Sequence, residues 1–208
     1  MAGDAELGQL RHKFEQMKPL WDTINALAFA IEAKDPYTAG HSKAVSKLAE
    51  RIAIQVGLSQ TEIEEIRLGG IVHDIGKIHV PEYVLNKPTL LTAEEFEIMK
   101  THAAWGANLL KPLKVIAIER IVRYHHERYD GKGYPEGLAG DKIPLGARIV
   151  AVAEAFDAMR STYVYNKGRS LEDAIAEMRR CSGTQFDPKV VTAFLDGLET
   201  HGDPRRQQ

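Results

Sequence analysis

The chain has 208 residues, enough for one well-buried domain with an appendage and too few for two domains of ordinary size. Its 44% hydrophobic and 27% charged residues exclude a mainly disordered chain, and its net charge of -2 argues against bulk binding to nucleic acid. The one cysteine, Cys181, excludes an internal disulfide, and no apolar run reaches the roughly 18 residues of a membrane span. We therefore expect a cytoplasmic protein with neither a nucleic acid nor a membrane partner.

Apolar residues at steps of three and four predict an amphipathic helix near the N-terminus. This stripe either packs on its own domain or forms a dimer or signalling stalk, and Pro19 should kink or interrupt it. We expect residues 1–30 to be this helix or linker, 31–200 to be the main domain and 201–208 to be a polar tail. The stripe consists of Leu7, Leu10, Phe14, Met17, Trp21, Ile24, Ala28 and Ile31.

The rest of the chain reads as a series of helices without a convincing alternating strand pattern, so the predicted fold class is all-α. One helix should end at Gly57, Ser59 with Glu62 forms a capping box for the next, and Thr92 with Glu95 caps a third. Further helical patterns run through Val115, Ile118 and Val122, from Ala147 to Met159, from Leu171 to Cys181 and from Pro188 to Leu198.

An imidazole and a carboxylate, His73 and Asp74, stand side by side between apolar residues. Burying a carboxylate costs several kcal/mol unless it is paired or binds a metal, and a neutral imidazole is the usual co-ligand. The pair should lie near a helix C-terminus, where Gly76 can turn the backbone. We interpret it as part of a metal site.

Five of the eight histidines fall on or at the ends of apolar helical segments. One such histidine is more often a core residue, but five of them, with Asp74 and the buried-looking Glu154, would each need a partner out of water. Imidazole and carboxylate without thiolate suit iron, manganese, zinc or nickel. Seven ligands exceed the need of one ion, so two ions bridged by Asp74 are the economical solution. The seven are His41, His73, Asp74, His102, His125, His126 and Glu154.

The segment from Glu127 to Gly146 breaks the helical rhythm with five glycines and two prolines. A loop of this length inside a domain is usually functional or disordered. Its charged and aromatic residues favour a structured binding loop: Arg128, Tyr129, Asp130, Lys132 and Tyr134.

Several motifs follow one another in a fixed order between residues 31 and 197. They are Asp35-Pro36-Tyr37-Thr38-Ala39-Gly40-His41, His73-Asp74-Ile75-Gly76-Lys77, His102, His125-His126-Glu127-Arg128, Asp130-Gly131, Gly133-Tyr134-Pro135, Ile143-Pro144, Ala147-Arg148-Ile149 and Phe186-Asp187-Pro188. In this order the chain resembles the HD-GYP family of bacterial signalling phosphodiesterases, a branch of the HD superfamily of metal-dependent phosphohydrolases. The resemblance implies an HD-domain helical bundle with a GYP loop extension.

The resemblance also implies hydrolysis of cyclic di-GMP to pGpG and on to GMP by a metal-bridging hydroxide. It implies two divalent ions, iron or manganese before zinc or nickel, with Asp74 as the bridge. Lys77 would steady the phosphoryl oxygens, and Asp157 would orient the nucleophile or relay a proton. The first ion would be held by His41, His73, Asp74 and Glu154, and the second by His102, His125 and His126.

The GYP loop would shape one wall of the site and, in the family, is associated with protein partners such as diguanylate cyclases. The substrate contacts carried over from the resemblance are Arg128, Asp130, Gly133, Tyr134, Pro135 and Arg148.

The chain departs from the family pattern at three places. Glu154 stands where the family usually has Asp, and Tyr37 stands where some members place a Glu for a third metal. Residues 163–166 replace the family's Arg-Pro-Tyr and a following basic residue, which bind the phosphates of the substrate. This replacement would cost about a few kcal/mol of substrate binding unless other cations compensate. The candidates for compensation are Arg160, Lys167 and Arg169.

These departures leave three functional hypotheses open. The first is an active phosphodiesterase, the second a weakened or inactive module that binds metals and acts through a partner or nucleotide, and the third a hydrolase of another phosphoester.

Overall fold

The computed structural model describes residues 19, 22–26, 28, 40–161 and 168–202. Over these residues the secondary structure is helical, with two isolated β-bridges that join Asp130 to Ala139 and Ser182 to Phe186. The all-α prediction is confirmed. Among the described residues no helix combines the length and the apolar character needed to cross a membrane.

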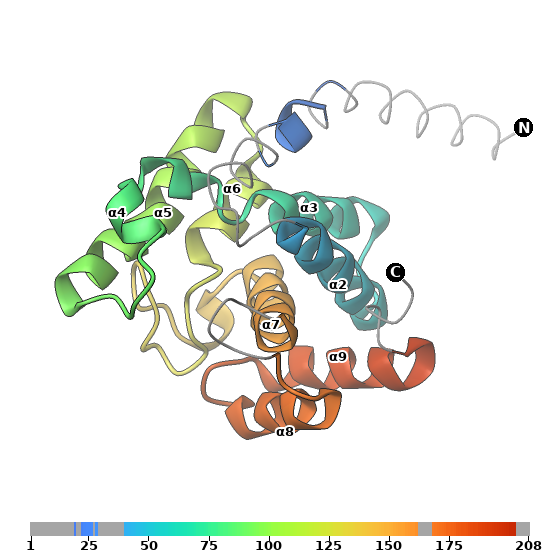
Figure 1. Cartoon of the computed structure of the whole chain (residues 1–208). Helices are drawn as coiled ribbons and strands as arrows, with labels where there is room; N and C mark the ends of the chain where they lie inside the picture. Colours follow the sequence, from blue (N-terminus) through green and yellow to red (C-terminus); the bar gives the residue numbers. More distant parts are fainter. Residues whose placement is uncertain (1–18, 20–21, 27, 29–39, 162–167, 203–208) are drawn as a thin grey trace, which may run out of the picture.

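The helices pack around α7, which lies between two groups of helices in Figure 1. Helices α4 and α5 lie on one side, α2 and α3 on the other, and α8 and α9 pack beside α7. In chain order the elements are α2 (His41–Val56), α3 (Gln60–Val72), η1 (Ile75–His79), α4 (Glu82–Leu85), α5 (Ala93–Leu110), η2 (Lys111–Leu113), α6 (Ile116–Tyr124), η3 (Gly140–Lys142), α7 (Leu145–Arg160), α8 (Leu171–Cys181) and α9 (Pro188–His201).

The predicted helix ends are confirmed where a specific residue determines them. The capping boxes of Ser59 with Glu62 and of Thr92 with Glu95 both form, with hydrogen bonds in each direction. Gly57 ends α2 in the left-handed region with φ of 84°, a conformation that glycine adopts without strain.

Two local expectations differ from the structure. The link between His79 and Leu91 contains Pro81 and Pro88, which predict an irregular segment, but it includes the single helical turn α4. Gly76 does not turn the backbone with a positive φ but lies in η1, where an added Cβ would stand 1.9 Å from the carbonyl oxygen of His102. Glycine at this position therefore allows η1 to approach the backbone of α5, which places Asp74 next to His102.

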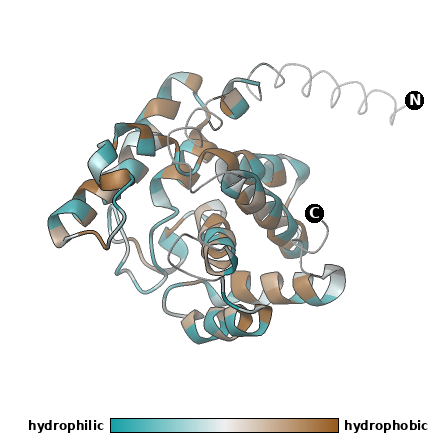
Figure 2. Ribbon diagram, in the orientation of Figure 1, coloured by the Kyte–Doolittle hydropathy of each residue, from teal (hydrophilic) through white to brown (hydrophobic). Residues whose placement is uncertain are grey.

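Two clusters of buried apolar residues form the core, and Figure 2 shows the corresponding alternation of hydrophobic and hydrophilic residues along the helices. The larger cluster joins α2, α7, α8 and α9 around Phe156, and includes Cys181. The smaller cluster contains Ile24, which is fully buried against α3, η1, α5 and α6. At Ile24 the N-terminal stripe therefore packs on its own domain. The other stripe residues except Ala28 lie outside the described residues.

Candidate metal centre

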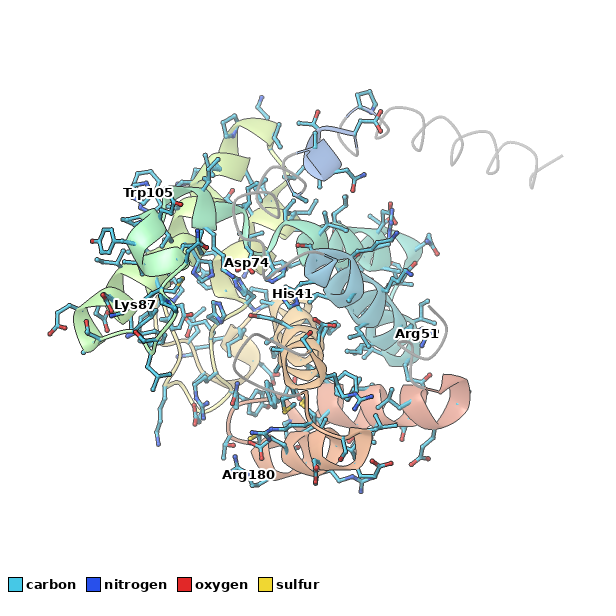
Figure 3. All side chains as sticks on the ribbon, in the orientation of Figure 1. His41, Arg51, Asp74, Lys87, Trp105 and Arg180 are labelled. Carbon is cyan, nitrogen blue, oxygen red and sulfur yellow. The ribbon has the colours of Figure 1, made fainter. Side chains whose placement is uncertain are left out.

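The predicted ligands come from five different helices and meet near the middle of the molecule, where Figure 3 labels His41 and Asp74. His41 begins α2, and His73 and His125 stand at the C-caps of α3 and α6, each followed directly by a second predicted ligand. His102 lies within α5 and Glu154 within α7. The structure brings six of these residues, all except Glu154, into two adjoining groups, and their role as metal ligands stays a prediction.

Three of the histidines are fixed by the same local device. The Nδ1 atoms of His73, His102 and His125 lie 2.9, 2.7 and 2.7 Å from the carbonyl oxygens of the residues three positions earlier in the chain. A carbonyl oxygen only accepts a hydrogen bond, so Nδ1 must carry the proton in each ring. Nε2 is therefore left to bind a metal ion, as in most histidine metal sites.

His41 is oriented by a carboxylate instead of a carbonyl. Its Nδ1 lies 2.6 Å from Oδ2 of Asp157, which is fully buried on α7. A carboxylate behind a ligating imidazole fixes the ring and raises its basicity. The structure thus places Asp157 behind a predicted ligand, where it orients the His41 ring, and its expected role toward the nucleophile stays a prediction.

The ligand atoms form two groups that share Asp74. One group joins His41, His73 and Asp74, and within each group the ligand atoms lie within 4.8 Å of one another. The second group consists of Asp74, His102, His125 and His126.

Two buried atoms of the site, Nε2 of His73 and Oδ1 of Asp74, have no hydrogen-bond partner among the described residues. Orphaned buried polar atoms are costly unless something binds them. Because the donor set is imidazole and carboxylate, these atoms fit one or more divalent cations.

The electrostatics favour deprotonated Asp74, His125 and His126 but a protonated His73. Burial lowers the pKa of His125 and His126 well below the usual range, so both rings are neutral at pH 7. Burial opposes the charge of Asp74, but the nearby Lys77 and His73 outweigh it and hold the pKa of Asp74 well below its usual range. In His73 burial also lowers the pKa, but the Asp74 carboxylate overrides it and raises the pKa to about 9. Metal binding at His73 therefore releases a proton.

Lys77 lies beside the carboxylate shared by the two groups. Its Nζ is 2.8 Å from Oδ2 of Asp74, and its side chain is only partly buried. The structure therefore brings the predicted active-site lysine to the edge of the ligand cluster.

Glu154 is the predicted ligand that the structure places least firmly. Its Oε1 lies 4.0 Å from Nε2 of His126, which belongs to the other predicted ion, and it falls outside both ligand groups. Burial raises the pKa of Glu154. Its expected place beside His41 and His73 stays a prediction.

The loop after α6 folds back onto the ligand that precedes it. The backbone N–H of Tyr134 donates to the carbonyl of His126, and the two rings stack with centroids 4.8 Å apart. Gly133 permits this return, since a Cβ there would stand 2.3 Å from the backbone nitrogen of Arg128. The predicted role of the GYP residues in shaping a wall of the site agrees with this packing of Tyr134, while Pro135 is exposed.

Glu127 holds this loop in place and was not recognised in the sequence as a residue with a role. It is 4% exposed, and its Oε1 accepts the backbone N–H of Glu136 at 2.8 Å. Burial raises the pKa of its carboxyl group. The only sequence signal was a carboxylate next to two metal ligands.

Two predicted substrate contacts are engaged with protein groups. Arg128 forms a two-point ion pair with Asp130, at 3.1 and 2.8 Å. Arg148 bonds through Nη1 to Asp141 and to the buried Asp187, which caps α9. Arg148 therefore ties η3 and α9 to α7, and substrate contact by its guanidinium stays a prediction.

Residues 163–166, which replace the family's phosphate grip, lie outside the described residues, as do Tyr37 and Lys167. Of the candidate replacements, Arg160 donates to the carbonyl of Arg169, and Arg169 lies 3.8 Å from a carboxylate oxygen of Glu177. Both guanidinium groups are thus engaged within the protein.

Residues 25–190 match the HD domain family, in the region that carries every predicted ligand. The chain belongs to the HD domain family. Its GYP triplet and its relatives confirm the predicted HD-GYP branch. A cyclic di-GMP phosphodiesterase of Thermotoga maritima is 42% identical over 180 residues, which cover 85% of this chain and 49% of the relative.

Two further relatives differ in the substrate that their names give. The cyclic di-GMP phosphodiesterase response regulator RpfG of Xanthomonas campestris is 42% identical over 179 residues, covering 85% of this chain and 47% of the relative. The 3'3'-cGAMP-specific phosphodiesterase 2 of Vibrio cholerae is 36% identical over 178 residues, covering 84% of this chain and 34% of the relative. This HD-GYP chain thus spans about half or less of the length of these relatives.

Solved structures share the fold of this HD-GYP chain. A cyclic GMP-AMP specific phosphodiesterase of V. cholerae, V-cGAP3, superposes with a TM-score of 0.69 at 22% identity, over 88% of this chain and 49% of that one. The HD domain of L. monocytogenes phosphodiesterase PgpH in complex with cyclic-di-AMP gives a TM-score of 0.63 at 23% identity, over 88% of this chain and 98% of that one. Both confirm the predicted HD-domain bundle.

Proposed function

We propose that this HD-GYP chain is a metal-dependent phosphodiesterase that hydrolyses cyclic di-GMP to pGpG, GMP or both. The observation that carries the proposal is the buried pair of ligand groups that share Asp74. Relatives named as cyclic di-GMP phosphodiesterases support the choice of substrate.

We further propose that the site holds two divalent ions, with iron or manganese preferred to zinc or nickel. Two groups of ligands around one shared carboxylate support the number, and mixed imidazole and carboxylate donors support the choice of metal. When bound, such ions act as Lewis acids toward a phosphoryl group and lower the pKa of a bound water.

The protein residues have distinct tasks in this proposal. The backbone carbonyls behind His73, His102 and His125 keep the Nε2 atoms aimed at the site, so little reorganisation is needed when ligands bind. Asp157 Oδ2 accepts the Nδ1 proton of His41 and keeps that ring in the same tautomer. Lys77 places a cation at the edge of the cluster, where it can stabilise phosphoryl oxygens.

A direct assay tests the enzymatic proposal. Protein loaded anaerobically with iron(II) or manganese(II) is incubated with cyclic di-GMP, and the products are separated from those of a His73→Ala/Asp74→Ala control. We expect pGpG or GMP from the wild type only. Turnover equal to that of the control would overturn the enzyme proposal and favour a metal-binding signalling module.

Two interactions with proteins also belong to this proposal. Residues 1–30 are proposed to contribute to a homodimer, and the GYP loop to bind a diguanylate cyclase-type partner. Pro135 and Glu136, which are exposed at the loop tip, support the second idea. Light scattering of the full chain, with and without a purified cyclase domain, tests both, and a monomer that forms no complex would contradict them.

A further inference from the structure

A cavity of about 190 Å³ opens beside the metal ligands, between α7, the loop after α6 and the loop between α8 and α9. Its lining includes the predicted ligands His126 and Glu154 together with Arg128 and Gln185. Sites that enclose a whole drug-sized ligand usually measure about 300–1,000 Å³. This cavity therefore has room for one part of a cyclic dinucleotide and not for the whole molecule.

The part of the wall formed by Arg128 and Gln185 is held by backbone hydrogen bonds between two loops. Tyr129 donates its N–H to the carbonyl of Gln185 at 3.1 Å, and Asp130 donates to the carbonyl of Thr184 at 2.8 Å. The N–H of Gln185 in turn bonds to the carbonyl of Cys181 at 3.0 Å. The two loops are thus joined at the point from which the Gln185 and Arg128 side chains line the cavity.

The charge on this wall is balanced. Arg128 is paired through Nε and Nη2 with the carboxylate of Asp130, and Gln185 is neutral. Ala151 and Ala155 of α7 add small apolar surface. Glu127 and Glu154 also line the cavity, so its described residues offer carboxyl groups but no unpaired cation. Such a lining suits a flat heterocycle better than a phosphate group, which prefers an unbalanced cation.

Hydrogen-bonding capacity remains on both polar side chains. The carboxamide of Gln185 and the Nη1 amine of Arg128 have no hydrogen-bond partner among the described residues. A carboxamide offers both a donor and an acceptor, and a guanidinium edge offers donors. Purine bases differ in the order of donors and acceptors along their edges, so this pair of groups can tell one purine from another.

We propose that Gln185 is a specificity-determining residue that, with Arg128, contacts the polar edge of one purine base of the cyclic dinucleotide while its phosphate lies at the metal ligands. The proposal rests on the proposed function for the identity of the substrate. It assigns a purine base to a cavity that is continuous with the ligands His126 and Glu154.

Substrates and mononucleotides that differ only in their bases test this proposal. The kcat/KM values for cyclic di-GMP, 3'3'-cGAMP and cyclic di-AMP are measured for the metal-loaded wild type and for Gln185→Leu. The dissociation constants of GMP and AMP are measured on the same samples, because they require no turnover. Gln60→Leu, which changes an exposed glutamine at the start of α3, is the matched control.

We expect Gln185→Leu to reduce the ratio of kcat/KM between the best and the worst substrate about 10-fold or more, as for one lost base-edge contact. The ratio of the dissociation constants of GMP and AMP should move toward one by a similar factor. Gln60→Leu should leave both ratios unchanged. Equal effects of Gln185→Leu on all substrates, at an unchanged melting temperature, would overturn the base contact while leaving the phosphodiesterase intact.

If the wild type shows no turnover but binds GMP and AMP with different dissociation constants, and Gln185→Leu abolishes that difference, only the proposed function is overturned. If the wild type shows neither turnover nor a preference between the two mononucleotides, both proposals fail.

Discussion

Asp157 is buried completely and lies 2.6 Å from Nδ1 of His41. Its contribution to metal affinity therefore acts through the orientation of His41 and not through direct ligation. We predict that Asp157→Leu weakens metal affinity about 10- to 100-fold, the usual effect of losing the partner of a ligating histidine. Asp157→Asn should retain more affinity, because an amide oxygen still accepts the His41 N–H. Isothermal titration with manganese measures both variants, and equal losses would contradict the orienting role.

Glu127 is predicted to stabilise the fold through one hydrogen bond to the loop. Removing its carboxylate in Glu127→Ala deletes the hydrogen bond that the backbone N–H of Glu136 donates to a buried carboxylate, which costs about 1–3 kcal/mol. The control Glu136→Ala keeps that N–H and loses an exposed ion pair with Arg123 and weak hydrogen bonds from Tyr124, at about 0–1 kcal/mol. Urea unfolding measures both, and equal costs would rule out the loop contact.

At the residue scale the sequence was sufficient to predict that five histidines and Asp74 gather into one cluster. Helical spacing shows which residues point the same way, but it does not show which distant group they meet. Glu127 meets a backbone N–H in an irregular loop, and Arg148 meets Asp187, which is 39 residues away. Helical spacing indicates neither contact, so the role of Glu127 was missed and Arg148 was expected at the substrate.

At the element scale, the approach of η1 to α5 is the step that brings two ligand-bearing segments together. Gly76→Ala would place a Cβ 1.9 Å from the His102 carbonyl and 2.5 Å from the Gly106 nitrogen, both backbone atoms. We predict loss of about 1–3 kcal/mol or more of stability, as in overpacked cores, together with weaker metal binding.

Gly197→Ala is the matched control for Gly76→Ala. It lies within α9, where nothing stands within 4 Å of an added Cβ, and should raise stability by about 0.5–1 kcal/mol. Thermal unfolding compares the two variants, and a melting temperature of Gly76→Ala equal to that of the wild type would contradict the close approach of η1 to α5.

The helices themselves were predictable because caps and apolar periodicity are local signals. Both capping boxes, the glycine end of α2 and the bounds of α8 followed from neighbouring residues. The turn α4 was not expected, since it has four residues between two prolines and lacks a side-chain cap. The need for glycine at position 76 arises from the backbone of α5, so it is visible only in the structure.

At the scale of the whole molecule, the metal centre links segments from His41 to Asp157 and should stabilise all of them together. We predict that free metal at 100 times its dissociation constant adds about 2.7 kcal/mol of stability, which raises the melting temperature by about 5–10 °C. Scanning fluorimetry with metal and after chelation measures the shift. His73→Ala/Asp74→Ala should show little shift, and a full shift in this variant would place binding elsewhere.

Anomalous scattering from crystals grown with manganese tests the metal centre most directly, because it locates ions without assuming an activity. The arrangement of ligands predicts two peaks that share Asp74, one next to His41 and His73 and one next to His102, His125 and His126. A single peak, or peaks that do not contact Asp74, would contradict the two-ion centre.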